Sequence, residues 1–367
     1  MGTTGTDATL RLNSQPTIIF NVTGDFRVND GQVLVDNPAG TNTHSLTIGG
    51  NLIVGIEAGG GNDIFNMTSG GTDNCNVIFT GVNATITENG PTNTITFNDV
   101  TFASAGNFFI QTNIDDINGA MTVNSSCVLI PSTDVVIGDN SSGTLTGSGI
   151  IHVTRLAATP NYSSQYNLLN EDLTGLTVDY SAEGPQTLSG RTYGTLRISG
   201  TGIKTGGATL ATINDELIIE SGTILSMTNV EDIYLSSATV TVDGTLEFTS
   251  TNGSIINSSG TSTLTMGPEG LIRTRNNGGL GPIAPLAENA SLVNNAGAVF
   301  NTNIATAGTV EYYRDGATPI TDQDYNNLII SNTGLRTWTL GAARTVNGNF
   351  IIETGAQLTL SGVKQLT

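Results

Sequence analysis

Charged residues are scarce in this 367-residue chain, where Asp, Glu, Lys and Arg together make up only 12% of the sequence. That share is about half of the usual one. The 12 Lys and Arg face 31 Asp and Glu, which gives a net charge of −19, and no Lys or Arg occurs between Arg27 and Arg155. Such a surface repels a phosphate backbone and offers no polybasic patch, so we expect no nucleic-acid partner and no membrane insertion.

Cysteine, histidine and tryptophan are also rare, with two, two and one residues respectively. Two stacked coils would hold Cys75 and Cys127 nearly ~10 Å apart, beyond the ~7 Å between Cα atoms that a disulfide allows. We therefore expect two buried free thiols, with a bridge through a loop as the lesser alternative. The single Trp338 and the isolated His44 and His152 provide neither metal-ligand spacing nor a nucleophile–base pair.

Glycine and short β-branched segments are what the chain has in abundance, with 46 glycines in all. Segments such as Val33–Val35 and Leu246–Phe248 alternate apolar and polar residues, and Gly, Asn, Asp or Ser follows nearly every one. This alternation is the period of a half-buried strand that ends in a tight turn.

A long internal repeat decides among the all-β folds. The phrase Tyr193–Gly202 returns as Tyr325–Gly334, 132 residues later, and the same offset places Lys204 on Arg336. One inserted residue further on, the phrase from Leu217 returns from Phe350. Weaker echoes begin at Leu46, Phe97 and Ile117. A sandwich predicts no fine repeat and a propeller predicts a blade of ~40–50 residues, whereas a solenoid predicts strand–turn units that bury their apolar side only by stacking.

We therefore predict an all-β fold, a parallel β-helix (β-solenoid), right-handed and of about 14–18 coils. Residues 1–367 are expected to form one continuous solenoid. Within it we expect weaker repeats over 1–156, a loop over 157–173 and the clearer 132-spaced repeat region over 174–367.

These phrases resemble the repeat region of large type IX-secreted, adhesin-like surface proteins of gliding and biofilm-forming bacteria. In that group an aromatic-x-Asn-Leu-x-Ile-Ser-x-Thr-Gly unit is followed by Ile-Asn-Gly-Asn-Leu-x-Ile-x-Ser-Gly. Tyr325–Gly334 and 346–358 carry the pattern well, whereas the copy from Tyr193 departs from it at Gly194 and Asp215. The resemblance implies an extracellular, cell-surface β-solenoid with an adhesive or scaffold role, and it implies no catalytic residue.

Parallel β-helices also include polysaccharide lyases and glycoside hydrolases, which need paired carboxylates or a proton-abstracting base. Asp115 and Asp116 are adjacent, and neighbours on a strand point to opposite faces. They could cooperate on a glycosidic bond only within a loop, and a turn before the next strand is the better interpretation. Arg273 and Arg275 share one strand face, where we expect them to face solvent or carboxylates of neighbouring coils.

Weak calcium candidates are Asn62 and Asp63, at the end of a glycine run that resembles one copy of the nonapeptide of the repeats-in-toxin family, and Asp322 and Asp324. Without a second nonapeptide or a third acidic neighbour, glycine-rich and surface turns are favoured. We expect no cofactor, with calcium as the one possible exception.

The sequence thus favours a non-catalytic, acidic, extracellular structural protein: a stalk, adhesin segment or filament subunit. Its expected partners are other copies or neighbouring units that associate end to end, with a surface polysaccharide as the second candidate. The alternative is a carbohydrate-binding or polysaccharide-degrading β-helix protein.

Overall fold

The computed structural model describes residues 8–12, 17–35, 41–55, 62–68, 73–90, 92–206, 211–228, 232–281, 290–362 and 365–367. The chain is nearly all β, with long parallel sheets, which confirms the predicted parallel β-helix. It divides into two compact units, unit 1 (Met1–Val178) and unit 2 (Asp179–Thr367). The predicted handedness and number of coils stay predictions.

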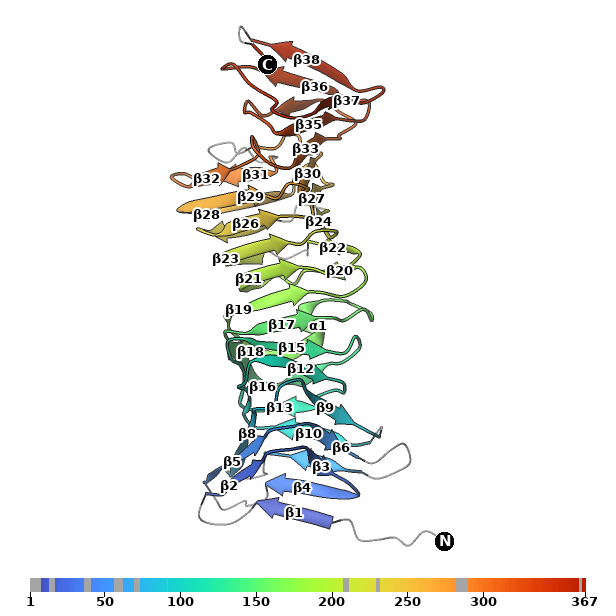
Figure 1. Cartoon of the computed structure of the whole chain (residues 1–367), viewed down its shortest axis with the longest axis vertical. Helices are drawn as coiled ribbons and strands as arrows, with labels where there is room; N and C mark the ends of the chain where they lie inside the picture. The colour runs from blue at the N-terminus through green and yellow to red at the C-terminus, as the bar shows by residue number, and fades with distance from the viewer. Residues whose placement is uncertain are drawn as a thin grey trace. The chain divides into compact units, whose positions relative to one another are not determined.

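In unit 1 the chain visits three parallel sheets in turn, and each strand pairs with its equivalent in the next coil (Figure 1). The first sheet contains β1 (Ala8–Leu12), β4 (Gly31–Val35), β7 (Ile64–Asn66), β10 (Thr94–Phe97) and β13 (Asp116–Ile117). The second contains β2 (Ile19–Val22), β5 (Thr43–Ile48), β8 (Asn74–Phe79), β11 (Val100–Phe102), β14 (Ala120–Val123), β16 (Ile137–Gly147) and β18 (Tyr166–Glu171). The third contains β3 (Phe26–Val28), β6 (Leu52–Val54), β9 (Ala84–Glu88), β12 (Gly106–Ile110), β15 (Cys127–Pro131), β17 (Ile150–Val153) and β19 (Leu173–Tyr180).

The core of unit 1 is built by the alternation that the sequence shows. Every second residue of a strand such as β8 is buried, so equivalent residues of successive coils form apolar columns. Phenylalanines from different sheets meet inside, with ring centroids of Phe79 and Phe97 6.4 Å apart and those of Phe102 and Phe108 5.1 Å apart. Because no single coil can bury its apolar side chains alone, stacking supplies most of the favourable free energy.

Unit 2 continues the same construction with three sheets that we name X, Y and Z. Sheet X contains β21 (Thr192–Ile198), β23 (Ala211–Ile219), β25 (Asp232–Ser236), β26 (Thr239–Val242), β28 (Ser254–Ser259), β29 (Thr261–Met266), β31 (Leu292–Asn294) and β32 (Val299–Thr302). Sheet Y contains β20 (Gln186–Thr187), β22 (Ile203–Thr205), β24 (Ile224–Met227), β27 (Thr245–Phe248), β30 (Leu271–Thr274), β33 (Thr309–Tyr312), β35 (Asn327–Ile330) and β37 (Phe350–Ile352). Sheet Z contains β34 (Thr318–Ile320), β36 (Leu335–Thr339) and β38 (Gln357–Ser361).

The two copies of the repeat occupy different sheets of unit 2. The first copy places β21 and β23 in sheet X and β20, β22 and β24 in sheet Y. The equivalent strands of the second copy, β35 and β37, lie in sheet Y, and β34, β36 and β38 lie in sheet Z. The 132-residue spacing is therefore not a whole number of coils, because the second copy sits one sheet further around the coil.

Two expectations need correction. The segment 157–173, expected to be a loop, contains the single-turn helix α1 (Tyr162–Gln165) and the strand β18, which pairs with β16. Tyr162 and Tyr166 are buried and their rings stack, and this packing orders a segment whose polar composition suggested a turn. Cys75 and Cys127 are buried free thiols, as predicted, but they lie in different sheets rather than in one column.

Candidate functional site

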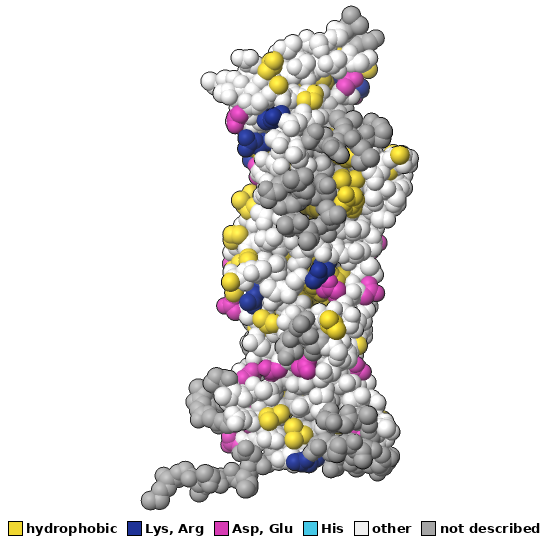
Figure 2. Space-filling model, turned by 180° about the vertical axis from the view of Figure 1, so that it is seen from behind, with side chains coloured by type: hydrophobic (Ala, Val, Ile, Leu, Met, Phe, Trp, Pro, Cys, Tyr) yellow, Lys and Arg dark blue, Asp and Glu magenta, His cyan; other side chains and the backbone are white. Residues whose placement is uncertain are grey.

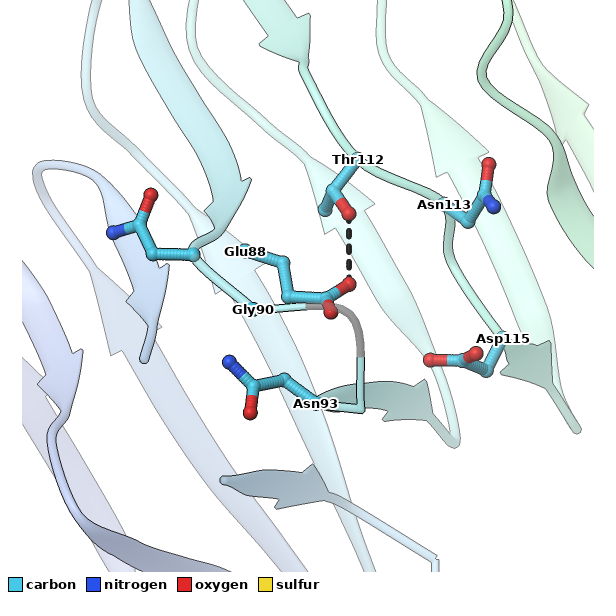
Figure 3. Close-up of a pocket in the computed structure, with 7 residues that line it drawn as sticks. Glu88, Gly90, Asn93, Thr112, Asn113 and Asp115 are labelled. Atoms are coloured by element: carbon cyan, nitrogen blue, oxygen red, sulfur yellow. Dashed lines mark hydrogen bonds between the residues drawn. The ribbon is translucent and has the colours of Figure 1, made fainter. Parts of the chain in front are cut away.

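A hollow of about 600 Å³ opens beside the end of β9, in unit 1. Its lining comes from two turns, one that follows β9 and one between β12 and β13 (Figure 3). The carboxylates of Glu88 and Asp115 point toward each other across it. The remaining lining residues are all small or uncharged: Asn89, Gly90, Asn93, Thr112 and Asn113.

The electrostatics of this hollow follow from its two carboxylates. Burial raises the pKa of Glu88, and the nearby charge of Asp115 raises it further, whereas the Thr112 hydroxyl, which donates to Glu88 Oε2 at 2.8 Å, opposes the shift. No Lys or Arg occurs in the sequence between Arg27 and Arg155 to offset these charges. Oxygen-rich linings of this kind suit a hard cation or sugar hydroxyl groups.

Several lining side chains already bind the backbone of a neighbouring coil. Asp115 Oδ2 accepts the N–H of Ile95 at 2.7 Å, and Asn93 Oδ1 accepts the N–H of Asp63 at 2.9 Å. Asn113 Oδ1 likewise accepts the N–H of Val136 at 2.9 Å. These side chains accept hydrogen bonds from backbone N–H groups that the strand ladders do not pair. The lining therefore has a structural role, whatever else it binds.

Asp115 and Asp116 do not form a paired site, in keeping with the favoured interpretation of a turn before the next strand. Asp116 begins β13, whereas Asp115 lies in the preceding turn and faces Glu88. Sequence reasoning missed Glu88 because 27 residues separate it from Asp115, and only the stacking of two coils makes them neighbours. The one available signal was the long stretch without a basic residue.

Asp63, one of the calcium candidates, accepts a backbone N–H from a neighbouring coil, as Asp115 does. Asp63 is 3% exposed and its Oδ1 accepts the N–H of Gly31 at 2.6 Å, while the adjacent Asn62 is exposed. The preceding glycine run, 59–61, lies outside the described residues. Within the described ranges, no group of three or more His, Cys, Asp or Glu is arranged to hold a metal ion.

Asp322 and Asp324 bind the following coil. Asp322 Oδ1 accepts from Arg344 Nε at 2.7 Å, and this bond holds the pKa of Asp322 below its usual value. Its Oδ2 accepts the N–H of Gly341 at 2.9 Å, and Asp324 Oδ1 accepts the N–H of Thr345 at 2.9 Å. Both carboxylates therefore tie successive coils together.

The basic cluster meets carboxylates of neighbouring coils, one of the two environments predicted for it. Arg273 of β30 lies in register between Glu247 of β27 and Glu311 of β33, at 2.5 Å and 2.6 Å. Burial acts to lower the pKa of Arg273, but Glu311 and Glu247 outweigh it, so the pKa lies above its usual value. A guanidinium held this way stays charged and is a poor proton-abstracting base. The second arginine, Arg275, pairs with Asp315 at 3.4 Å.

The repeated phrase builds a buried polar cluster, once in each copy. In the first copy the hydroxyls of Tyr180 and Tyr193 lie 3.3 Å apart, and Tyr180 accepts the N–H of Ser189 at 2.9 Å. Lys204 Nζ donates at 2.7 Å to each of three backbone carbonyls, those of Ala182, Gly184 and Thr201.

The second copy reproduces these contacts at the 132-residue offset. The hydroxyls of Tyr312 and Tyr325 lie 2.9 Å apart, and Tyr312 accepts the N–H of Thr321 at 3.1 Å. Arg336 takes the place of Lys204 and donates to the carbonyls of Gly316 and Arg314, the equivalents of Gly184 and Ala182. All four tyrosines are fully buried, so the repeated aromatic residues are core positions and not ligand sites.

Comparison with known proteins gives no family for this chain. No protein-family model, no curated protein and no solved structure matches it. No helix among the described residues is both long and apolar enough to cross a membrane. The described surface carries few charged groups, and most of the face in Figure 2 is uncharged polar side chain and backbone.

Proposed function

We propose that this chain is a non-catalytic, extracellular β-solenoid that serves as a stalk, an adhesin segment or a filament subunit, as its resemblance to type IX-secreted adhesin repeats suggests. The observation that supports this proposal is that the repeated residues have a structural role in both copies. Its most distinctive residues, Tyr180, Tyr193 and Lys204 with their second-copy equivalents, are buried and bind backbone groups of their own coil or of the preceding one. The sequence has duplicated a means of stacking rather than a reactive group.

The charged side chains that join neighbouring coils support the same proposal. Asp63, Asp322 and Asp324 accept backbone donors of neighbouring coils, and Arg273 bridges two coils through Glu247 and Glu311. Its proposed partners are other copies or neighbouring units stacked end to end, with a surface polysaccharide as the second candidate.

The alternative, a carbohydrate-binding or polysaccharide-degrading protein, rests on the hollow between Glu88 and Asp115. Its two carboxylates face each other, and the raised pKa of Glu88 is a property of general acids. Asp115, Asn93 and Asn113 of this lining already accept backbone N–H groups, which weighs against the alternative function.

Incubation with acidic and neutral polysaccharides separates the two functions. We expect neither new reducing ends nor unsaturated products, and the same result for Glu88→Gln. Turnover by the natural chain that Glu88→Gln abolishes would overturn the structural proposal and place an active site in the hollow.

A further inference from the structure

Asparagine is followed directly by glycine at five places in this chain, at Asn89, Asn118, Asn252, Asn277 and Asn347. Such a pair can react with itself, because the glycine nitrogen can attack the side-chain carbonyl carbon Cγ of the asparagine. Glycine favours this attack since it has no Cβ to hinder the approach and adopts a wide range of backbone angles. By sequence alone the five pairs are equal candidates.

The fold can withhold two things that the reaction needs. The glycine N–H must be free to lose its proton, and the asparagine side chain must be free to turn toward the glycine nitrogen. A hydrogen bond from the glycine N–H to another coil removes the first freedom, because that bond must open before the nitrogen can react. The five pairs therefore differ through the contacts that the stacked coils make with them.

Two pairs lie in turns that the stack holds in place. Gly119 and Gly348, which follow Asn118 and Asn347, donate their N–H groups to carbonyls of the preceding coil at 3.0 Å and 2.7 Å. The side chain of Asn347 is held as well, since its Nδ2 donates to the carbonyl of Ala305 at 2.8 Å. Both asparagines are exposed, so it is the hydrogen bonds and not burial that restrain these pairs.

Two further pairs meet only part of the requirement. The glycine after Asn89 has no partner for its N–H among the described residues, but Asn89 Nδ2 donates to the carbonyl of Gly55 at 3.3 Å. Asn252 is exposed, whereas Gly253 is buried and its carbonyl accepts from Asn276 Nδ2 at 2.7 Å. We expect both pairs to react slowly.

The fifth pair meets both requirements. Asn276 to Gly279 form a tight turn in unit 2, closed by the N–H of Gly279, which donates to the carbonyl of Asn276 at 3.1 Å. Asn277 and Gly278 are the two central residues. Asn277 is exposed and Gly278 is partly exposed, and among the described contacts neither the Asn277 side chain nor the Gly278 N–H has a hydrogen-bond partner. The N–H of Asn277 donates to the carbonyl of Thr251 at 3.4 Å, so the turn is anchored while its reacting groups are free.

We propose that Asn277 is a site of spontaneous deamidation in the folded protein. The Gly278 nitrogen forms a bond to Asn277 Cγ, the Cγ–Nδ2 bond breaks, and ammonia leaves with the proton that the Gly278 N–H gives up. Water then opens the resulting succinimide at either carbonyl, to give aspartate or isoaspartate. Each event replaces a neutral amide by a carboxylate, in a chain whose net charge is already −19.

The two products differ in their effect on the fold. The turn packs closely on β34 and the residue after it, because a Cβ on Gly279 would meet the carbonyl oxygen of Pro319, and the N–H of Gly281 donates to Thr321 Oγ1 at 2.9 Å. Isoaspartate adds one bond to the backbone of this turn and is expected to disturb that packing. Aspartate keeps the backbone and adds only the charge.

Mass spectrometry of the folded chain tests the site. The chain is kept in a mildly alkaline buffer made with heavy-oxygen water, so that only deamidation during the incubation carries the label. We expect Asn277 to be labelled at least about tenfold faster than Asn118 and Asn347, because their glycine N–H groups react only when the turn opens. In urea all five pairs should be labelled at similar rates. If Asn118 or Asn347 keeps pace with Asn277 in the folded chain, or if Asn277 stays unlabelled there while the unfolded chain reacts, the proposal is wrong.

Two further measurements test the cause. Backbone hydrogen exchange is expected to be at least about tenfold faster at Gly278 than at Gly119 and Gly348. Gly278→Ala should slow the labelling of Asn277 and leave that of Asn252 unchanged, since the φ of Gly278 lies outside the positive range and suits alanine. Slow exchange at Gly278, or undiminished labelling of Asn277 in Gly278→Ala, would contradict the inference.

Discussion

The two copies of the repeat in unit 2 make nearly the same internal contacts in different surroundings. Both hold a tyrosine pair and a cation on backbone carbonyls, and in both a serine hydroxyl bonds an acidic side chain at 2.6 Å, Ser199 to Asp179 and Ser331 to Glu311. In the first copy β26 and β27 pair with β23 and β24, whereas Phe350, Ile352 and Leu360 of the second copy are exposed. Contacts within a copy are therefore local products of the sequence, whereas burial depends on the neighbouring coil.

The largest expected difference between the copies concerns their equivalent leucines. Leu225→Ala removes a fully buried side chain and is expected to lower the free energy of unfolding by ~2–5 kcal/mol. Leu358→Ala removes a partly buried side chain of β38 and is expected to cost about 1 kcal/mol or less when the chain is dilute. Urea unfolding of both variants measures the difference. Equal losses in dilute solution would contradict the difference in burial between the two leucines.

Substitutions inside the two tyrosine clusters are expected to destabilise the protein by a smaller amount, and by the same amount in each copy. Tyr180→Phe leaves the N–H of Ser189 without its acceptor, and Tyr312→Phe does the same to Thr321. Each loss should lower the free energy of unfolding by about 1–2 kcal/mol. A difference between the variants much above about 0.5 kcal/mol in urea unfolding would contradict the equivalence of the copies.

The smallest expected effect is a pH dependence of stability that Lys204 contributes and Arg336 does not. Burial lowers the pKa of Lys204 to about 8, against the pull of Asp179, while the unfolded chain titrates near ~10.4. The folded state therefore binds fewer protons than the unfolded state between these values, so its stability rises with pH across that window. We expect the natural chain to gain about 1–3 kcal/mol relative to Lys204→Met from pH 7.5 to pH 10.

Arg336→Met provides the matched control for that pH series. Burial lowers the pKa of Arg336 below its usual value, but a guanidinium remains charged in this range. The difference between the natural chain and Arg336→Met should therefore stay constant from pH 7.5 to pH 10. A flat profile for Lys204→Met as well would show that the three carbonyls hold the ammonium group charged.

Much of the architecture could be predicted because strand alternation and turn glycines are local signals. The equivalence of Lys204 and Arg336 was visible as a repeat and proved to be a shared contact with backbone carbonyls. The order in 157–173 could not be predicted, since it depends on the stacking of Tyr162 on Tyr166 and on the pairing of β18 with β16. The candidate hollow could not be predicted either, since Glu88 and Asp115 become neighbours only because the lengths of their coils bring the two turns together.

By itself the sequence determined the parallel β-helix, because alternating residues and glycine turns can bury their apolar side only by stacking. It also determined the scarcity of charge on the surface. Only the tertiary structure decided which sheet each copy of the repeat occupies, because the lengths of turns set how far around the coil 132 residues reach. It likewise decided that Glu88 and Asp115 face each other, because that depends on how two coils of different length stack.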